Sequence, residues 1–131
     1  MQPATHLGLD HRLCGEPVSL ADGTATVRFV ATPEMAADER GLVHGGFVFG
    51  LADHAAMLAV NDPNVVLGGS EARFTAPVKV GDVVVATASR TEVAGRRHTL
   101  AVEARVGDVV VLSGTLTAFV LDRHVLDGRS S

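Results

Sequence analysis

One carboxylate lies inside the most apolar stretch of the chain. Residues 45–60 are mostly apolar, and Asp53 is the single acidic residue among them. A buried carboxylate without a partner is strongly destabilising, so either a structural partner or a function must account for it. Burial would raise the pKa of Asp53, which suits a general base or a nucleophile. The structural alternative is an ion pair or a hydrogen bond with His54 or with an arginine of a neighbouring strand.

Two adjacent glycines open the same stretch, in the sequence His44-Gly45-Gly46. Glycines let a ligand approach the backbone closely. The first N–H groups of a helix have no intrahelical partner and lie at the positive end of its dipole, so they can stabilise a developing oxyanion. The alternative is that Gly45 and Gly46 only form a tight turn into a packed helix.

The spacing between Asp53 and the glycine pair indicates that one active site needs residues from two copies of the chain. Gly46 and Asp53 are seven residues apart, which is about 10 Å along one helix. A reacting carbonyl must lie about 3 Å from both its oxyanion donor and the attacking group. Two antiparallel copies of the helix, related by a two-fold axis, could bring Gly46 of one subunit near Asp53 of the other. The motif therefore predicts a dimer with two shared sites.

The apolar stretch also predicts the helix that holds these residues. Apolar side chains occur on every face of Gly45 to about Val60, which is typical of a buried central helix. The sequence Asn61-Asp62-Pro63-Asn64 is expected to end that helix. A short helical turn is expected at Thr32-Pro33-Glu34.

Strand-like patterns lie on both sides of the helix, separated by turn residues. Turns are expected at residues 21–23, 80–81, 94–96 and 107–108. One buried helix with about six antiparallel strands predicts an α+β fold in which the sheet curls around the helix. The expected strands run from Val18 to Leu20, Thr24 to Val30, Val65 to Thr75, Asp82 to Glu92, Arg97 to Arg105 and Val109 to Leu121.

Composition narrows the classes of protein. The 131 residues fit a single domain, with loose ends expected at residues 1–12 and 126–131. A net charge of -4 and the absence of Trp and Tyr disfavour nucleic acid and anionic membranes as partners. Cys14 is the one cysteine, and neither a signal peptide pattern nor a metal-ligand spacing of histidines is present. We therefore expect a cytoplasmic protein without a bound metal.

The motif resembles that of hotdog-fold acyl-CoA thioesterases, particularly the phenylacetate-pathway (PaaI-like) branch. The matching residues are Gly41, then His44-Gly45-Gly46, then Leu51-Ala52-Asp53 inside the helix. Downstream, Phe74-Thr75-Ala76-Pro77 followed by Gly81-Asp82 resembles the strand segment of that family that ends in Pro and Gly-Asp. The resemblance covers roughly Thr24 to Leu121.

This resemblance implies a hotdog fold and hydrolysis of an acyl-CoA thioester to a free acid and coenzyme A. Gly46 resembles the residue whose backbone N–H polarises the thioester carbonyl. Asp53 resembles the carboxylate that activates water or attacks the carbonyl, and His44 resembles the residue that orients the carbonyl or the glycine turn. The family works as homodimers, often as tetramers, with coenzyme A along a subunit interface and with no cofactor.

Two positions depart from the family pattern. Asp38 stands where an Asn is usual, and Leu67 stands where some relatives place a Ser or Thr. The other functions considered are an enoyl-CoA hydratase or dehydratase on the same fold, and a non-catalytic acyl-CoA-binding protein. Arg73 could meet the phosphates of coenzyme A, although turn and strand-end arginines are more often plain solvated charge. The expected substrate-binding residues are Gly45, Asp38, Leu67, Gly68, Ser70, Phe74 and Arg73.

Overall fold

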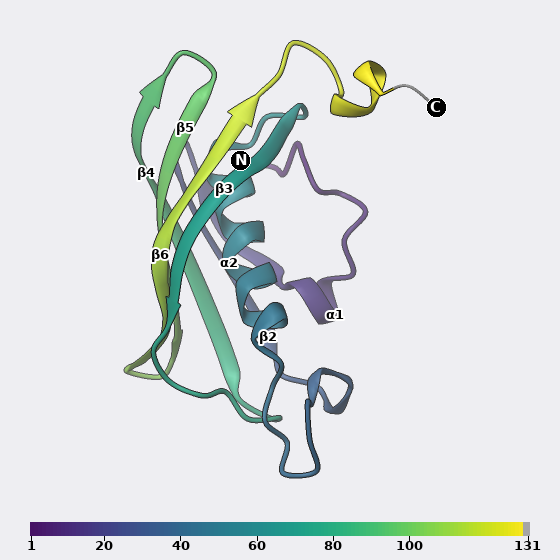
Figure 1. The fold of residues 1–131 in the computed structure, drawn as a ribbon, viewed down its shortest axis with the longest axis vertical. Helices are drawn as coiled ribbons and strands as arrows, with labels where there is room; N and C mark the ends of the chain where they lie inside the picture. The colour runs from purple at the N-terminus through teal and green to yellow at the C-terminus, as the bar shows by residue number, and fades with distance from the viewer. Residues whose placement is uncertain (130–131) are drawn as a thin grey trace.

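The computed structural model describes residues 1–129, and it consists of one antiparallel sheet and one long helix (Figure 1). The helix α2 spans Gly45–Val60, as predicted. The strands are β1 Glu16–Ala21, β2 Thr24–Val30, β3 Val65–Phe74, β4 Val83–Ala94, β5 Arg97–Val106 and β6 Val109–Val120. Short helical segments complete the fold at α1 His11–Cys14, η1 Pro33–Met35 and η2 Val125–Gly128.

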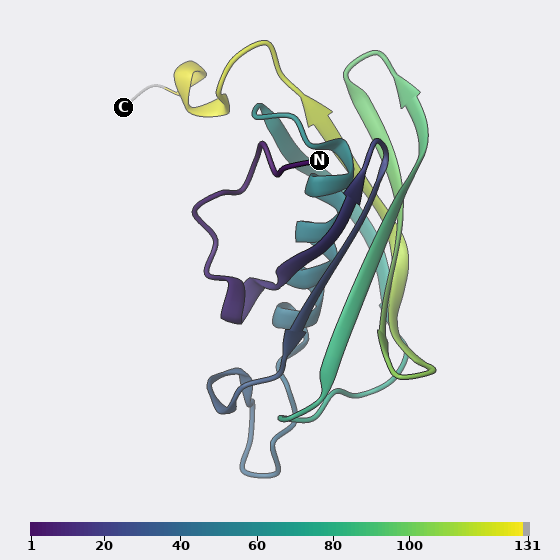
Figure 2. The same cartoon turned by 180° about the vertical axis from the view of Figure 1, so that it is seen from behind.

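The six strands form one sheet in the order β1-β2-β4-β5-β6-β3, with every neighbouring pair antiparallel. The sheet curves around α2, which lies against one of its faces (Figures 1 and 2). The predicted hotdog arrangement of about six strands around one central helix is confirmed. Strand β3 does not pair with β4, which follows it in the sequence. It crosses to the far edge and pairs with β6.

The predicted turns are found between the strands. Residues Ala21 and Thr24 face each other across the β1–β2 turn, and two-residue connections also join β4 to β5 and β5 to β6. Gly23, Gly95 and Gly107 have positive φ angles in these turns, which favour glycine. At most of the strand ends, the observed bound differs from the predicted one by one or two residues.

The two ends of α2 are fixed by local chemistry. The side chain of His44 caps the first turn by accepting a hydrogen bond from the Gly46 N–H. At the other end, Asn61 takes a left-handed conformation with φ 53°, and its N–H donates to the Met57 carbonyl. Asparagine tolerates this conformation better than most residues, so the predicted stop is explained by its side chain.

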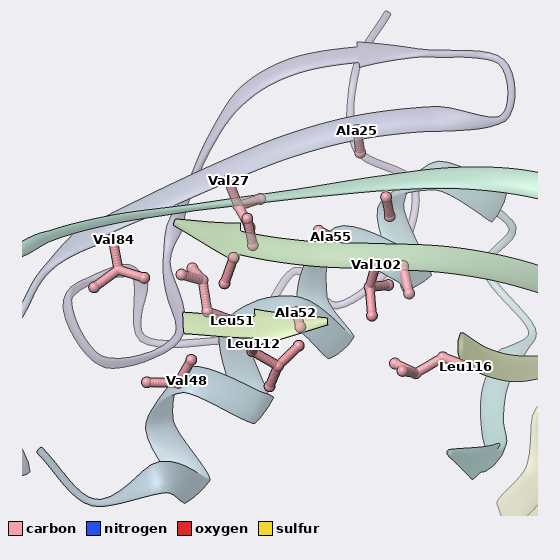
Figure 3. Close-up of a cluster of buried hydrophobic side chains, with 14 of the residues drawn as sticks. Ala25, Val27, Val48, Leu51, Ala52, Ala55, Val84, Val102, Leu112 and Leu116 are labelled. Carbon is pink, nitrogen blue, oxygen red and sulfur yellow. The ribbon is translucent and has the colours of Figure 1, made fainter. Parts of the chain in front are cut away.

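The core lies between α2 and the sheet (Figure 3). Leu51, Ala52 and Ala55 of the helix are fully buried. Because two of these three side chains are small, the helix backbone can pack close to the strands. The strands contribute mostly branched aliphatic side chains to the same cluster, among them Val27, Val84, Val102, Leu112 and Leu116.

The N-terminus differs from the loose end expected for residues 1–12. Residues 2–15, which we call the N-terminal strap, run along the side of α2 that faces away from the sheet (Figure 2). Asn61 holds the start of the strap, because its side chain donates to the Gln2 carbonyl and accepts from the Ala4 N–H at 2.7 Å. Thr5, within the strap, is buried. These are contacts between residues far apart in the chain, and local composition gives no sign of them.

The C-terminal segment after β6 is exposed where it is described, through the short helix η2. Residues 130–131 of the expected loose end lie outside the described residues. Within residues 1–129, no helix has the length and apolar character needed to span a bilayer.

Candidate active site

The turn into α2 presents an ordered set of donors. His44 Nδ1 lies 2.9 Å from the Gly46 nitrogen and accepts its N–H. The neutral imidazole therefore carries its proton on Nε2, and this N–H can donate to another group. The Gly45 N–H has no hydrogen-bond partner within residues 1–129. A Cβ at Gly46 would lie 2.8 Å from His44 Nδ1, so glycine is required for this close approach.

Asp53 lies mid-helix and is half-buried. Its Oδ1 atom is fully buried and has no hydrogen-bond partner in the described part of the chain. Burial raises the pKa of the Asp53 carboxyl from its ordinary value of 3.8 to about 6. A carboxylate with this pKa is ionised at neutral pH and is a stronger base than an exposed aspartate.

The structural explanation considered for Asp53 does not hold in the described part of the chain. His54 points to the N-terminal strap instead, where its Nδ1 lies 3.1 Å from the Cys14 carbonyl oxygen. All the ion pairs found among residues 1–129 involve other acidic residues. Asp53 is therefore a carboxylate without a structural partner among residues 1–129.

One face of α2 carries both candidate catalytic features. Gly46, Gly50 and Asp53 are spaced by four and three residues, which places them on the same side of the helix. A Cβ at Gly50 would meet no atom within 4 Å, so there is open space beside the helix between the two features. The separation of Gly46 and Asp53 along a regular helix remains too long for one carbonyl to reach both.

The register of β3 decides which of its residues share a side with α2. Leu67, Ser70 and Phe74 pair with the buried residues Ala118, Leu116 and Leu112, so they lie on the helix side of the sheet. They nevertheless remain exposed, with Leu67 at 37% and Phe74 at 56%. The helix covers the middle of the sheet, and it leaves this side of the edge strand open.

Two expected substrate-binding residues have other positions on β3. Arg73 pairs with the exposed Ser113, so it lies on the outer face of the sheet, away from α2. Gly68 sits at an irregularity in the pairing with β6, and a Cβ there would collide with the ring of Phe119. The register therefore separates Arg73 from Gly46 and Asp53 of its own chain, and it gives Gly68 a packing role.

Gly45 and Phe74 meet beside the helix N-terminus. The Phe74 ring lies 3.2 Å from the position that a Cβ on Gly45 would occupy. Both residues line a cavity of about 420 Å³, together with Val48 and Val111. Sequence reasoning missed Val48 and Val111 as cavity residues, because their apolar side chains look like ordinary core positions.

Asp38 lies at a second cavity of about 340 Å³, which also contains Arg40, Lys79 and Asp82. Its Oδ1 accepts the N–H groups of Arg40 and Leu42, at 2.9 and 3.2 Å. Asp38 therefore fixes the loop that leads to His44. The two cavities share Leu42, Pro77 and Val78.

Comparison with known proteins agrees with this geometry. Residues 40–113 match the family model described as "Thioesterase superfamily", and this match includes the glycine turn, α2 and β3. The chain belongs to the thioesterase superfamily. Structures of related members support the assignment. An uncharacterized protein from Pyrococcus horikoshii is 49% identical, with a TM-score of 0.95 over 97% of this chain and 98% of that one.

Another superfamily structure connects the chain to the PaaI-like branch. A mutant of the phenylacetic acid degradation protein PaaI from Thermus thermophilus is 31% identical, with a TM-score of 0.76 over 83% of this chain and 95% of that one. A curated relative, methylthioribose-1-phosphate isomerase from Aquifex aeolicus (strain VF5), is 48% identical over 103 residues. These residues are 79% of this chain, which spans only 23% of that longer protein.

Proposed function

We propose that this member of the thioesterase superfamily hydrolyses an acyl-CoA thioester to a free acid and coenzyme A. The observation that carries the proposal is Asp53, whose buried Oδ1 has no partner and whose pKa is raised to about 6. Such a carboxylate is suited to take a proton from water. Membership of the thioesterase superfamily supports a thioester as the substrate.

The reaction needs an acceptor for negative charge on the carbonyl oxygen. The Gly46 N–H is the donor expected from the sequence, but it donates to His44 Nδ1. The free donor of this turn is therefore the Gly45 N–H beside it, which has no partner within residues 1–129 and lies at the positive end of the helix dipole. His44 keeps its Nε2 proton while Nδ1 accepts from Gly46, so it can orient the carbonyl by donation.

In the general-base route, Asp53 takes a proton from a water molecule as the water oxygen forms a bond to the thioester carbon. The carbonyl electrons move to the oxygen, which the N–H groups at the start of α2 stabilise. The C–S bond then breaks, and the proton held by Asp53 returns to the departing thiolate. In the nucleophilic route, an Asp53 oxygen bonds to the carbonyl carbon and the C–S bond breaks, which releases the thiolate of coenzyme A. Water then hydrolyses the resulting anhydride to the free acid and the Asp53 carboxylate, and the proton released in this step neutralises the thiolate.

A homodimer would complete this site. The helix side of β3 is open, and the row of Gly46, Gly50 and Asp53 on α2 has space beside it. A second copy placed across a two-fold axis at this edge would cover the exposed apolar residues and bring its Asp53 near Gly46. Coenzyme A would then lie along the subunit boundary. A dimer of dimers is compatible with the same contact.

Release of free thiol from a panel of acyl-CoAs, including phenylacetyl-CoA, tests the proposal. We expect turnover by the wild-type protein and a loss of at least about 100-fold in Asp53→Ala and Asp53→Asn, which lack a base at this position. Asp108→Asn, an exposed turn residue, is the matched control. Equal turnover by all four proteins would remove Asp53 from the mechanism. Binding of acyl-CoA without any thiol release would instead identify a non-catalytic binder, and hydration of an enoyl-CoA would identify a hydratase.

A further inference from the structure

The cavity beside the start of α2 has an unusually apolar wall for a site next to backbone donors. It is about 420 Å³ in volume, which is within the size range of small-molecule pockets. Its lining is almost entirely aliphatic or aromatic, and it contains no charged residue. The lining residues are Leu42, Val43, Gly45, Val48, Phe74, Thr75, Ala76, Pro77, Val78 and Val111.

Several polar groups in this wall are already paired with one another. The Val43 N–H donates to the Val78 carbonyl at 2.8 Å, and the Thr75 N–H donates to the Val111 carbonyl at 2.9 Å. The Thr75 hydroxyl donates to the Val110 carbonyl at 2.6 Å. A ligand segment rich in amides, such as the pantetheine arm of coenzyme A, would leave its own polar groups unpaired here, which is unfavourable. An apolar chain fits the wall without that cost.

The position of Gly45 connects this cavity to the proposed chemistry. Gly45 lines the cavity, and its N–H has no partner within residues 1–129. A thioester carbonyl held by the N–H groups of this turn would therefore have one substituent at the cavity mouth. Because the cavity disfavours the amides of pantetheine, that substituent is the acyl chain.

Phe74 is the wall residue best placed to limit the length of that chain. Its ring contacts the Gly45 backbone region, 3.2 Å from the position of a Cβ there, and 56% of the residue is exposed. It is also the one aromatic residue in the lining. We infer that this cavity is the acyl pocket and that Phe74 determines which acyl lengths it accepts. This inference rests on the proposed thioesterase function for the identity of the ligand.

Binding of analogues that cannot be hydrolysed tests the pocket separately from turnover. The probes are ketone analogues of straight-chain acyl-CoAs, in which CH₂ replaces the thioester sulphur, with acyl chains from two to twelve carbons. Isothermal titration calorimetry of the wild-type protein should give a rise of up to about fourfold in affinity per added methylene until the pocket is filled. In Phe74→Ala the rise should continue to longer chains. Val93→Ala, an exposed apolar residue outside the cavity, should keep the wild-type limit.

The outcomes separate this inference from the proposed function. A limit that moves to longer chains only in Phe74→Ala supports the acyl pocket, whether or not thiol is released from the true thioesters. The same limit in all three proteins, or no dependence on chain length in the wild type, would overturn it. Absence of thiol release with every thioester, together with the expected binding profile, would overturn the catalytic proposal alone. Because Phe74 is exposed on an edge strand of the single chain, we expect its Ala variant to fold, and circular dichroism checks this. Light scattering checks that the variant keeps the oligomeric state of the wild type, since the same strand is the expected dimer contact.

Discussion

Asp53 combines two properties that oppose each other at neutral pH. Its ionised form is the one that can act as a base, and that form is disfavoured by burial without a partner for Oδ1. A residue kept in such an environment is typical of an active site, where stability is lower than the fold could provide.

The raised pKa gives a prediction for activity. The carboxyl of free Asp53 is half-ionised at about pH 6. We therefore expect kcat/KM for thioester hydrolysis to fall about tenfold per pH unit below about pH 6, because the protonated acid cannot accept a proton. The measurement is a pH profile of the wild-type protein at limiting substrate. A profile that stays flat from pH 7 to pH 4.5 would contradict a catalytic role for an ionised Asp53.

The same pKa gives a prediction for stability with the opposite pH dependence. The folded pKa of about 6 lies above the ordinary value of 3.8, so the folded chain binds more protons than the unfolded chain between these values. The ionised carboxylate therefore destabilises the fold above about pH 6, by on the order of 3 kcal/mol. Asp53→Asn should raise the free energy of unfolding relative to wild type at pH 8 and should lose that advantage near pH 4. Urea unfolding at both pH values measures the difference, and a pH-independent difference would show that the charge is not responsible.

Among the elements, the N-terminal strap and α2 are joined by a buried histidine. His54 is 2% exposed, and its Nδ1 lies 3.1 Å from the Cys14 carbonyl, so the ring donates its Nδ1 proton to the strap. The ring of His11 stacks on it with a centroid separation of 6.3 Å. Burial is the main cause that lowers the pKa of His54, and His6 and His11 of the strap add to the lowering.

This arrangement predicts that acid loosens the strap. The folded pKa of His54 lies below the ordinary 6.5, so between these values the unfolded chain binds more protons than the folded one. Its contribution to the free energy of unfolding therefore decreases as the pH falls below 6.5 and stops decreasing below the folded pKa. His54→Gln, which keeps a donor for Cys14 but does not titrate, should show a weaker loss of stability between pH 7 and pH 5.

Comparison of His54→Gln with a control variant separates the effect of His54 on the free energy of unfolding from that of Asp53. Protonation of Asp53 changes this free energy in the opposite direction at acid pH. His124→Gln is the matched control, because His124 is exposed and far along the chain. Hydrogen exchange at residues 2–15 gives a local measurement. Equal slopes of the free energy of unfolding against pH for His54→Gln and His124→Gln would exclude His54 as the cause.

At the scale of the whole molecule, the open helix side of β3 and the distance between Gly46 and Asp53 lead to the same expectation. Strand β3 lies at the edge of the sheet, and its exposed Leu67 and Phe74 lie on the side where a second helix could pack. An uncovered edge strand with apolar neighbours is a common interaction surface. The dimer expected from the helix spacing therefore has a defined contact face.

A mixing experiment tests whether the sites are shared. Asp53→Ala removes the base, and Gly46→Ala places a Cβ 2.8 Å from His44 Nδ1, so it disturbs the turn that holds the carbonyl oxygen. Each homodimer should be inactive. Co-expressed chains that assort at random should recover about a quarter of the wild-type activity, because half of the dimers then contain one complete site of two. Light scattering checks that the mixture is dimeric, and no recovery in a dimeric mixture would place both groups in the same chain's site.

The sequence by itself determined the features that depend on local pattern. The bounds of α2 followed from its continuous apolar composition and from the asparagine that ends it, and the hairpins followed from turn glycines. Asp53 stood out because a charge in an apolar helix is costly in any arrangement. One buried helix with about six antiparallel strands gave a sheet curled around that helix, and the motif around His44 gave the family.

The tertiary structure decided everything that depends on pairing between distant segments. It placed β3 beside β6, and this register put Phe74 on the helix side and Arg73 on the outer face. It placed the Phe74 ring beside Gly45 and hydrogen-bonded His54 to the strap. It left the buried Oδ1 of Asp53 without a hydrogen-bond partner within residues 1–129. A single sequence indicates whether each segment favours a helix or a strand. It does not indicate which distant segment packs against it. These contacts arise from packing among residues tens of positions apart, and only the folded chain specifies them.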